Sequence, residues 1–223
     1  QNDVIDVADL DLLTTEFDED GEPMYFEGSA DIKMINCENE HATVWVCGTG
    51  IRTSENAARW IENWLNEIDE NPDSAHKVIS YPQTDVDTYH ADCVIEPVDA
   101  NHTVMSVVNV PQEVINEISK YTIIIPCDDV DILKAGVCNF LRAGNNIMMG
   151  SDINLLEGSE YVEDYEIEKR KIEFMQKVCN ELGLNLNVYC LSEAYKGGAC
   201  LSCNCADLRG WAFIREMDWS YKY

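Results

Sequence analysis

The sequence predicts an α/β fold built from repeated strand–strand–helix–strand units. Short apolar runs that are typical of strands alternate with amphipathic helices along the chain, and two strands precede each helix. Residues 92–106 also resemble residues 137–149, an offset of about 45 residues that is typical of a propeller or another array of supersecondary units. A doubly wound parallel sheet is the alternative, but that fold places one strand before each helix.

The three units can be followed in chain order, and the helices carry the clearest patterns. Apolar side chains at helical spacing predict a helix over 54–68 and a longer one over 161–182, with Gly183 just after its end. Pro111 opens a short helix in the second unit. The expected elements are strands at 32–35 and 43–47, helix 54–68 and strand 77–80; strands at 93–96 and 104–110, helix 111–120 and strand 122–125; and strands at 138–141 and 147–149, helix 161–182 and strand 186–190.

The chain is expected to contain an acidic N-terminal segment, 1–24, and a single domain over 25–223, in which a fourth unit begins at Gly197. Its 42 Asp and Glu against 15 Lys and Arg give a net charge of −27. A surface this acidic repels phosphate backbones and anionic lipids, so we expect neither nucleic acid nor membrane as a partner. The ten cysteines are not needed as staples in a chain of this length, which favours a reducing compartment and a cytoplasmic location.

Three segments carry polar residues at the ends of apolar runs. The first is Tyr89-His90-Ala91-Asp92, which leads into an expected strand. In an extended segment His90 and Asp92 would project to the same face, where a carboxylate can hold a cation while the imidazole transfers protons. A surface histidine beside a solvated aspartate is the simpler interpretation of the same pattern.

The second segment runs from Lys196 to Cys205 and contains two adjacent glycines followed by three cysteines. A cysteine in such a flexible stretch suits a nucleophile that a nearby positive charge holds as thiolate. The spacing of Cys200, Cys203 and Cys205 would also supply three thiolates to zinc or iron, but a structural zinc site usually has a second pair of ligands. A redox pair is a further alternative.

The third segment joins residues 26–31 with residues 48–55. Glu27 and Asp31 are expected to begin a strand, and Arg52 lies in a glycine-containing loop that leads into the helix at 54–68. Thr53 or Ser54 can cap this helix through its hydroxyl, and capping alone would explain both residues.

Taken in order, these segments resemble the guanidino-group modifying enzymes of the pentein superfamily, such as arginine deiminases, dimethylarginine dimethylaminohydrolases and arginine:glycine amidinotransferases. The resemblance covers roughly residues 25–210, and the order of the short motifs carries most of its specificity. It implies a pseudo-symmetric β/α propeller. The family's first repeat has no counterpart in residues 1–24, which leaves three explanations open: the given sequence lacks this repeat, a partner chain supplies it, or the protein is a divergent and inactive member.

The resemblance also implies a covalent mechanism without a metal or an organic cofactor. Cys203 would attack the guanidinium carbon of a small cationic substrate such as arginine, with Cys200 as the alternative nucleophile. His90 would transfer protons, Glu27 and Asp92 would hold the guanidinium, and Arg52 would meet a substrate carboxylate. The spacing leaves open whether Glu27 or Asp31 is the functional acid, and we favour Glu27.

Hydrolysis to a ureido product is the reaction we expect first, as in a deiminase. Amidino transfer to an amine is the second candidate, because residues 203–210 loosely resemble the C-terminal run of the amidinotransferases. A non-catalytic pentein that binds a ligand or a protein is the third. The aromatic residues at 211–223 could pack within the chain or against a second copy, which leaves a homo-oligomer open.

Overall fold

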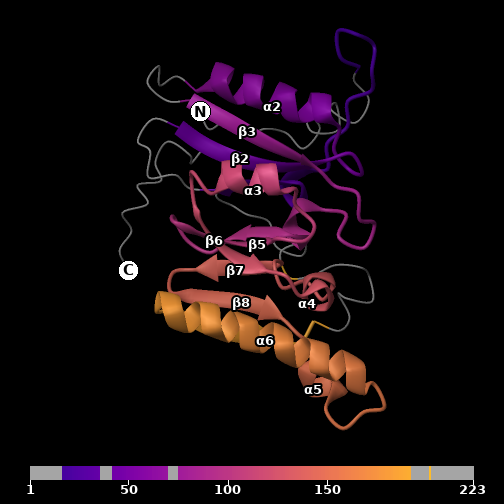
Figure 1. The fold of residues 1–223 in the computed structure, drawn as a ribbon, viewed down its shortest axis with the longest axis vertical. Helices are drawn as coiled ribbons and strands as arrows, with labels where there is room; N and C mark the ends of the chain where they lie inside the picture. Colours follow the sequence, from indigo (N-terminus) through magenta and orange to yellow (C-terminus); the bar gives the residue numbers. More distant parts are fainter. Residues whose placement is uncertain (1–16, 36–41, 70–74, 192–200, 202–223) are drawn as a thin grey trace, which may run out of the picture. The chain divides into compact units, whose positions relative to one another are not determined.

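The computed structural model describes residues 17–35, 42–69, 75–191 and 201. The chain divides into two compact units, Gln1–Asp128 and Asp129–Tyr223. Among the described residues there are three sheets of three strands each (Figure 1), two in the first unit and one in the second.

Each sheet pairs its first two strands antiparallel and its last two parallel, with helical structure in the parallel crossover. The first sheet contains β1 (Ile32–Ile35), β2 (Ala42–Thr49) and β3 (Ala75–Pro82), with α2 (Glu55–Ile68) before β3; the second contains β4 (Ile95–Pro97), β5 (His102–Ser106) and β6 (Ile123–Cys127), with α3 (Gln112–Ile118) before β6; the third contains β7 (Phe140–Ala143), β8 (Asn146–Gly150) and β9 (Asn185–Tyr189), with α5 (Ile153–Leu156) and α6 (Val162–Leu182) before β9. The expected strand–strand–helix–strand order is therefore confirmed in all three described repeats, each of which forms one sheet.

Several boundaries differ from expectation, and short helical pieces account for most of the differences. The expected strand at 93–96 is only Ile95–Pro97, because Ala91–Cys93 form a 3-10 turn, η2, that delays its start. A similar turn, η1 (Gly28–Ala30), precedes β1, while α4 (Val130–Lys134) and α5 were not expected. The fourth unit expected from Gly197 lies outside the described residues. The single domain over 25–223, its propeller symmetry and its missing repeat stay predictions.

Helix α2 shows how local sequence fixes one element of the first unit. Its cap is Ser54, whose hydroxyl oxygen accepts a hydrogen bond from the backbone N–H of Ala57 at 3.3 Å. The buried face contains Ala57, Ala58, Ile61 and Leu65, as the periodicity predicts, whereas Ile68 is exposed. Trp60 and Trp64, four residues apart, stack on each other with ring centroids 5.8 Å apart.

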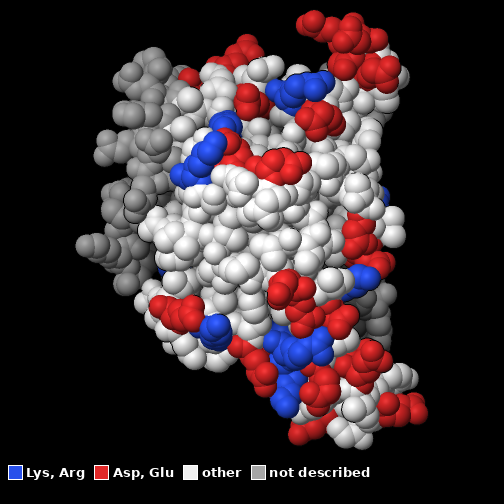
Figure 2. All heavy atoms as spheres, in the orientation of Figure 1, with Lys and Arg blue, Asp and Glu red and all other residues white. Residues whose placement is uncertain are grey.

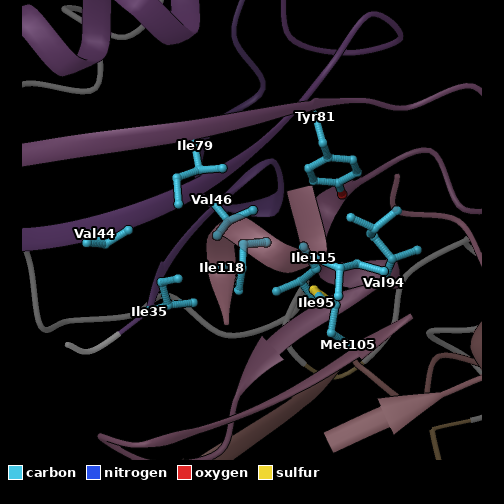
Figure 3. Packing of buried hydrophobic residues seen from close by; sticks show 11 residues of the cluster. Ile35, Val44, Val46, Ile79, Tyr81, Val94, Ile95, Met105, Ile115 and Ile118 are labelled. Atoms are coloured by element: carbon cyan, nitrogen blue, oxygen red, sulfur yellow. The ribbon is translucent and has the colours of Figure 1, made fainter. Parts of the chain in front are cut away.

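Both sheets of the first unit contribute to a shared hydrophobic core. Ile35, Val44 and Val46 come from the first sheet, and Ile95 and Met105 come from the second (Figure 3). At the edge of this core an ion pair joins the neighbouring strands β1 and β4, since Lys33 Nζ lies 2.9 Å from Glu96 Oε2. Two successive repeats are therefore packed into a single compact body that carries the segments discussed below.

In the second unit, α6 brings a charged pair into the interior. Lys171 is fully buried and its ammonium donates to Glu168 and to the carbonyl oxygen of Ala135, each at 2.8 Å. Glu168 also accepts a hydrogen bond of 2.5 Å from the hydroxyl of Ser151. These bonds compensate for the desolvation of both charges. Gly183 ends the helix with φ of +68°, as its position in the sequence predicts.

The described surface agrees with the acidic composition. On the face that Figure 2 shows, Asp and Glu side chains are widely spread, with smaller groups of Lys and Arg among them. Within the described part of the chain, each helix is too short or too polar to cross a membrane.

We predict that Ile95→Ala lowers the free energy of unfolding by about 2–5 kcal/mol, because it opens a cavity in the core of the first unit. Ile123→Ala is the matched control, since Ile123 is 60% exposed, and it should change stability by less than about 0.5 kcal/mol. Urea unfolding measures both changes. Equal losses in the two variants would contradict the assignment of the core.

Candidate active site

Three loops of the first unit bring together most of the described candidate residues. Glu27 comes directly before η1, Arg52 lies between β2 and α2, and His90 lies between β3 and η2. Gly50 has φ of +106°, a conformation that side chains other than glycine's rarely tolerate, and its N–H donates to the carbonyl oxygen of Thr53 at 2.7 Å. This tight turn fixes the loop that carries Arg52.

The side chain of Asp31 connects the three loops through hydrogen bonds. Its side chain is fully buried, and Oδ2 accepts a short hydrogen bond of 2.6 Å from the hydroxyl of Thr53. Its Oδ1 accepts from the backbone N–H of Ala91 at 3.4 Å. The Thr53 oxygen in turn accepts from the backbone N–H of Glu27 at 3.3 Å. The buried carboxylate therefore ties η1, the β2–α2 loop and η2 to one another.

The environment of Asp31 makes its charge costly. Burial raises the pKa of the carboxyl group, and the hydrogen bond from Thr53 and the nearby imidazole of His90 act in the opposite direction. The outcome is a pKa above the ordinary 3.8 of an aspartate. Thr53 was expected only as a helix cap, a role that Ser54 has instead.

Glu27 and His90 form the pair that faces solvent. Glu27 Oε2 lies 2.8 Å from His90 Nε2 and 3.4 Å from Arg52 Nε. The side chains of Glu27 and Arg52 are 43% and 49% exposed, whereas His90 is 16% exposed. An accessible carboxylate thus lies in hydrogen-bond contact with a largely covered imidazole, and both are groups that can take part in general acid–base chemistry.

Tyr89 also belongs to this group, although no role was expected for it from the sequence. The guanidinium carbon of Arg52 lies 5.1 Å from the centre of the Tyr89 ring, within the range of a cation–π interaction. The His90 ring lies 4.4 Å from the same ring at a tilt of 58°. Its position next to a candidate histidine was the only signal in the sequence that could have identified it.

Two further residues that the sequence did not reveal support the loop of His90. The amide of Gln83 donates to the carbonyl oxygen of Thr88 at 3.4 Å, and the amide of Asn109 donates to the hydroxyl of Thr88 at 3.2 Å. The backbone N–H of Gln83 also donates to the carbonyl oxygen of Thr49 at 2.7 Å. Gln83 packs so closely on Gly48 that a Cβ there would lie 2.5 Å from its side chain.

Two local expectations are wrong. Glu27 and Asp31 do not begin a strand, because the N–H of Asp31 donates back to the carbonyl oxygen of Gly28 and closes the turn η1. His90 and Asp92 do not share one face of an extended segment, because Asp92 lies within η2 and is only 3% exposed. The carboxylate that contacts His90 is therefore that of Glu27, which is distant in sequence.

Glu27, Asp31 and His90 each place one possible metal-ligating atom within 4.8 Å of the others. However, both oxygens of Asp31 already accept hydrogen bonds, and His90 Nε2 already contacts Glu27. A metal ion would have to replace these contacts. The arrangement fits a hydrogen-bonded acid–base pair better than a vacant metal site.

Cys200 and Cys203 lie outside the described residues, so the nucleophile stays a prediction. Among the described cysteines, burial raises the pKa of the thiols of Cys47 and Cys179 and makes them poor nucleophiles. Cys190 is exposed, and its thiol lies 3.6 Å from Asp152 Oδ1.

No family model and no curated protein matches this sequence. Solved structures do. The apo structure of ArgZ, an arginine dihydrolase from the ornithine–ammonia cycle in cyanobacteria, matches with 19% identity and a TM-score of 0.58, over 83% of this chain and 25% of that one. The N-terminal domain of ArgZ bound to product matches with 19% identity and a TM-score of 0.56, over 83% and 59%. AgrE with ornithine and NAD+ matches with 17% identity and a TM-score of 0.56, over 82% and 24%.

These likenesses concern the fold. At 17–19% identity they show that this chain shares a fold with ArgZ and AgrE, in agreement with the repeated α/β architecture expected from the sequence. The chain spans about a quarter of full-length ArgZ and AgrE and about 60% of the N-terminal domain of ArgZ.

We predict that Asp31→Asn gains stability relative to the parent chain as the pH rises. A carboxyl whose pKa is raised by folding stabilises the folded state while it is protonated, and this contribution is lost as the pH rises from about 3.8 through the raised value. Asparagine has no such loss. Urea unfolding at pH 3.5 and pH 7 tests this, with the exposed Asp20→Asn as the charge-matched control. A difference that stays constant or reverses with pH would contradict the prediction.

We predict that Thr53→Val lowers the free energy of unfolding by about 1–3 kcal/mol, because it leaves buried polar groups without their hydroxyl partner. Thr53→Ser keeps the hydroxyl and should retain most of the stability. Chemical denaturation of both variants measures the difference. Equal effects of valine and serine would mean that the hydroxyl does not hold Asp31 in place.

Proposed function

We propose that this chain binds a small cationic guanidine, such as arginine, and hydrolyses its guanidino group to a ureido group. The observation that carries the proposal is the contact between Glu27 and His90. An exposed carboxylate and a largely covered imidazole meet at 2.8 Å, above a buried carboxylate that fixes both loops. Glu27 and His90 lie 63 positions apart in the sequence, so the tertiary structure brings them into contact.

The features around Glu27 suit a planar cation. A guanidinium donates two parallel hydrogen bonds to a carboxylate, and Glu27 is accessible for such a contact. The ring of Tyr89 offers an aromatic face beside it, and the net charge of −27 attracts cations to the protein as a whole. Asp92 is the second acid that the resemblance of its H-x-D motif assigns to the guanidinium, but it is only 3% exposed within η2, so the geometry supports Glu27 and not Asp92 in this role.

The geometry supports different roles for Glu27 and Asp31, which the sequence left open. Both oxygens of Asp31 are used by Thr53 and Ala91, and its side chain is fully buried. Glu27 reaches solvent and contacts the imidazole. We therefore assign Glu27 to the substrate and Asp31 to positioning.

In the proposed reaction, the Cys203 thiolate forms a bond to the guanidinium carbon. The bond from that carbon to a terminal nitrogen then breaks, and His90 gives this nitrogen the proton with which it leaves as ammonia. A water molecule, deprotonated by His90, attacks the same carbon. The carbon–sulfur bond breaks, which returns the thiolate and releases the ureido product.

Amidino transfer differs only in its leaving group and acceptor, because the alkyl amine departs and a second amine replaces water. The likeness to ArgZ, an arginine dihydrolase, supports water as the acceptor. A non-catalytic pentein is the third candidate, and an ordinary reactivity of Cys203 toward iodoacetamide would favour it. A chain of this length does not need its cysteines as disulfide staples, which supports a cytoplasmic location for each candidate.

We predict that the chain forms citrulline, or ornithine if a second hydrolysis follows, from arginine. Cys203→Ser should abolish both products, whereas Cys200→Ser should retain them. His90→Gln should reduce the rate by about 10²–10⁴-fold, because it removes the proton-transfer group. Amino-acid chromatography with arginine as substrate measures these effects.

The exposed Cys190→Ser is the matched cysteine control and should retain activity. Activity lost only in Cys200→Ser would keep the reaction and reassign the nucleophile. Formation of a new amidino compound only when glycine is added would favour transfer over hydrolysis. A parent chain that neither converts nor binds any guanidine would refute the proposed function.

A further inference from the structure

The site already holds a guanidinium of its own. Arg52 places Nε at 3.4 Å from Glu27 Oε2 and its guanidinium carbon at 5.1 Å from the centre of the Tyr89 ring. These are the carboxylate and the aromatic face that the proposed function assigns to the substrate guanidinium. The two cations cannot use the same contacts at once.

We propose that Arg52 acts as a resident competitor that selects guanidines carrying a carboxylate, a specificity that rests on the proposed function. Arg52 occupies Glu27 until a ligand arrives. A carboxylate on the ligand offers Arg52 a new partner and draws it away from Glu27, while the ligand's guanidinium takes its place. A guanidine without a carboxylate must displace Arg52 without this compensation.

The contacts of Arg52 are weak enough to be exchanged. The side chains of Arg52 and Glu27 are 49% and 43% exposed, and ion pairs this exposed contribute little to stability. A cation–π contact at an exposed ring is similarly weak. His90 retains its closer contact with the Glu27 oxygen, 2.8 Å against 3.4 Å, and so holds the carboxylate in place during the exchange.

Only the side chain of Arg52 needs to move. Its backbone is held between Gly50, whose N–H donates to the carbonyl oxygen of Thr53, and the Thr53 hydroxyl that donates to Asp31. Asp31 is not an alternative partner for the displaced guanidinium, because it is buried and both of its oxygens accept hydrogen bonds. A carboxylate supplied by the ligand meets this requirement, with the paired geometry that guanidinium favours.

The test compares L-arginine with agmatine, which is arginine without its carboxylate, by calorimetric titration. A background with both Cys200→Ser and Cys203→Ser prevents turnover, so binding is measured alone. We expect Arg52→Ala to bind agmatine about three- to tenfold more tightly, because the competitor is gone, and arginine about tenfold more weakly. Agmatine carries the larger positive charge, but comparing each ligand between variants removes this general preference.

Arg59→Ala is the matched control, since Arg59 is an exposed arginine on α2 that lies outside the Glu27–His90 pair. It should change the two affinities by similar small factors. Arg52→Gln serves as a second variant should Arg52→Ala fold poorly, which circular dichroism reports.

The opposite response of the two ligands is the result that supports the proposal. If arginine and agmatine weaken together, Arg52 is an ordinary part of the site and the competition is refuted, while the proposed function stands. If only arginine weakens and agmatine is unchanged, Arg52 does not compete for Glu27. If no guanidine binds to the parent or to the variants, the proposed function fails and this specificity fails with it.

Discussion

The hydrogen bond between the buried Asp31 carboxylate and the Thr53 hydroxyl is the interaction on which the site depends. It joins a turn before the first strand to the loop before α2, and the second oxygen of Asp31 reaches the backbone of the third loop at Ala91. Burial of this acid is unfavourable, as its raised pKa indicates. The cost is compatible with folding because the Thr53 hydroxyl and the backbone N–H of Ala91 both donate hydrogen bonds to the buried carboxylate.

This arrangement separates two carboxylates that lie four residues apart in the sequence. Asp31 is withdrawn into the interior, while Glu27 stays at the surface and meets His90. The division is physical: one acid has its oxygens used by internal donors, and the other keeps an accessible face for a ligand. His76 and His102 also contact carboxylates, those of Asp69 and Asp99, but these partners are seven and three residues away in the sequence, whereas Glu27 lies 63 positions from His90.

Arg52 and Tyr89 belong to the same site, where the guanidinium of Arg52 contacts both Glu27 and the Tyr89 ring. A guanidinium that rests on the acid and on an aromatic ring is a weak internal ligand, and weak contacts at an exposed position can be exchanged without unfolding the loop. In the proposed function, affinity and selectivity are assigned to different residues. Glu27 would bind the cationic group of any guanidine, while Arg52 would discriminate by what the rest of the ligand carries.

Periodicity and motif order are local properties of a chain, so the sequence predicted the order of strands and helices, singled out Glu27, Arg52 and His90 as candidates, and carried the resemblance to penteins. It could not determine that Asp92 and Asp31 lie in or beside 3-10 turns, since such turns are set by backbone hydrogen bonds rather than by a side-chain pattern. Tertiary structure alone decided that Glu27 contacts His90 across 63 positions of the chain. That contact follows from the packing of two repeats around one core, which no local pattern records.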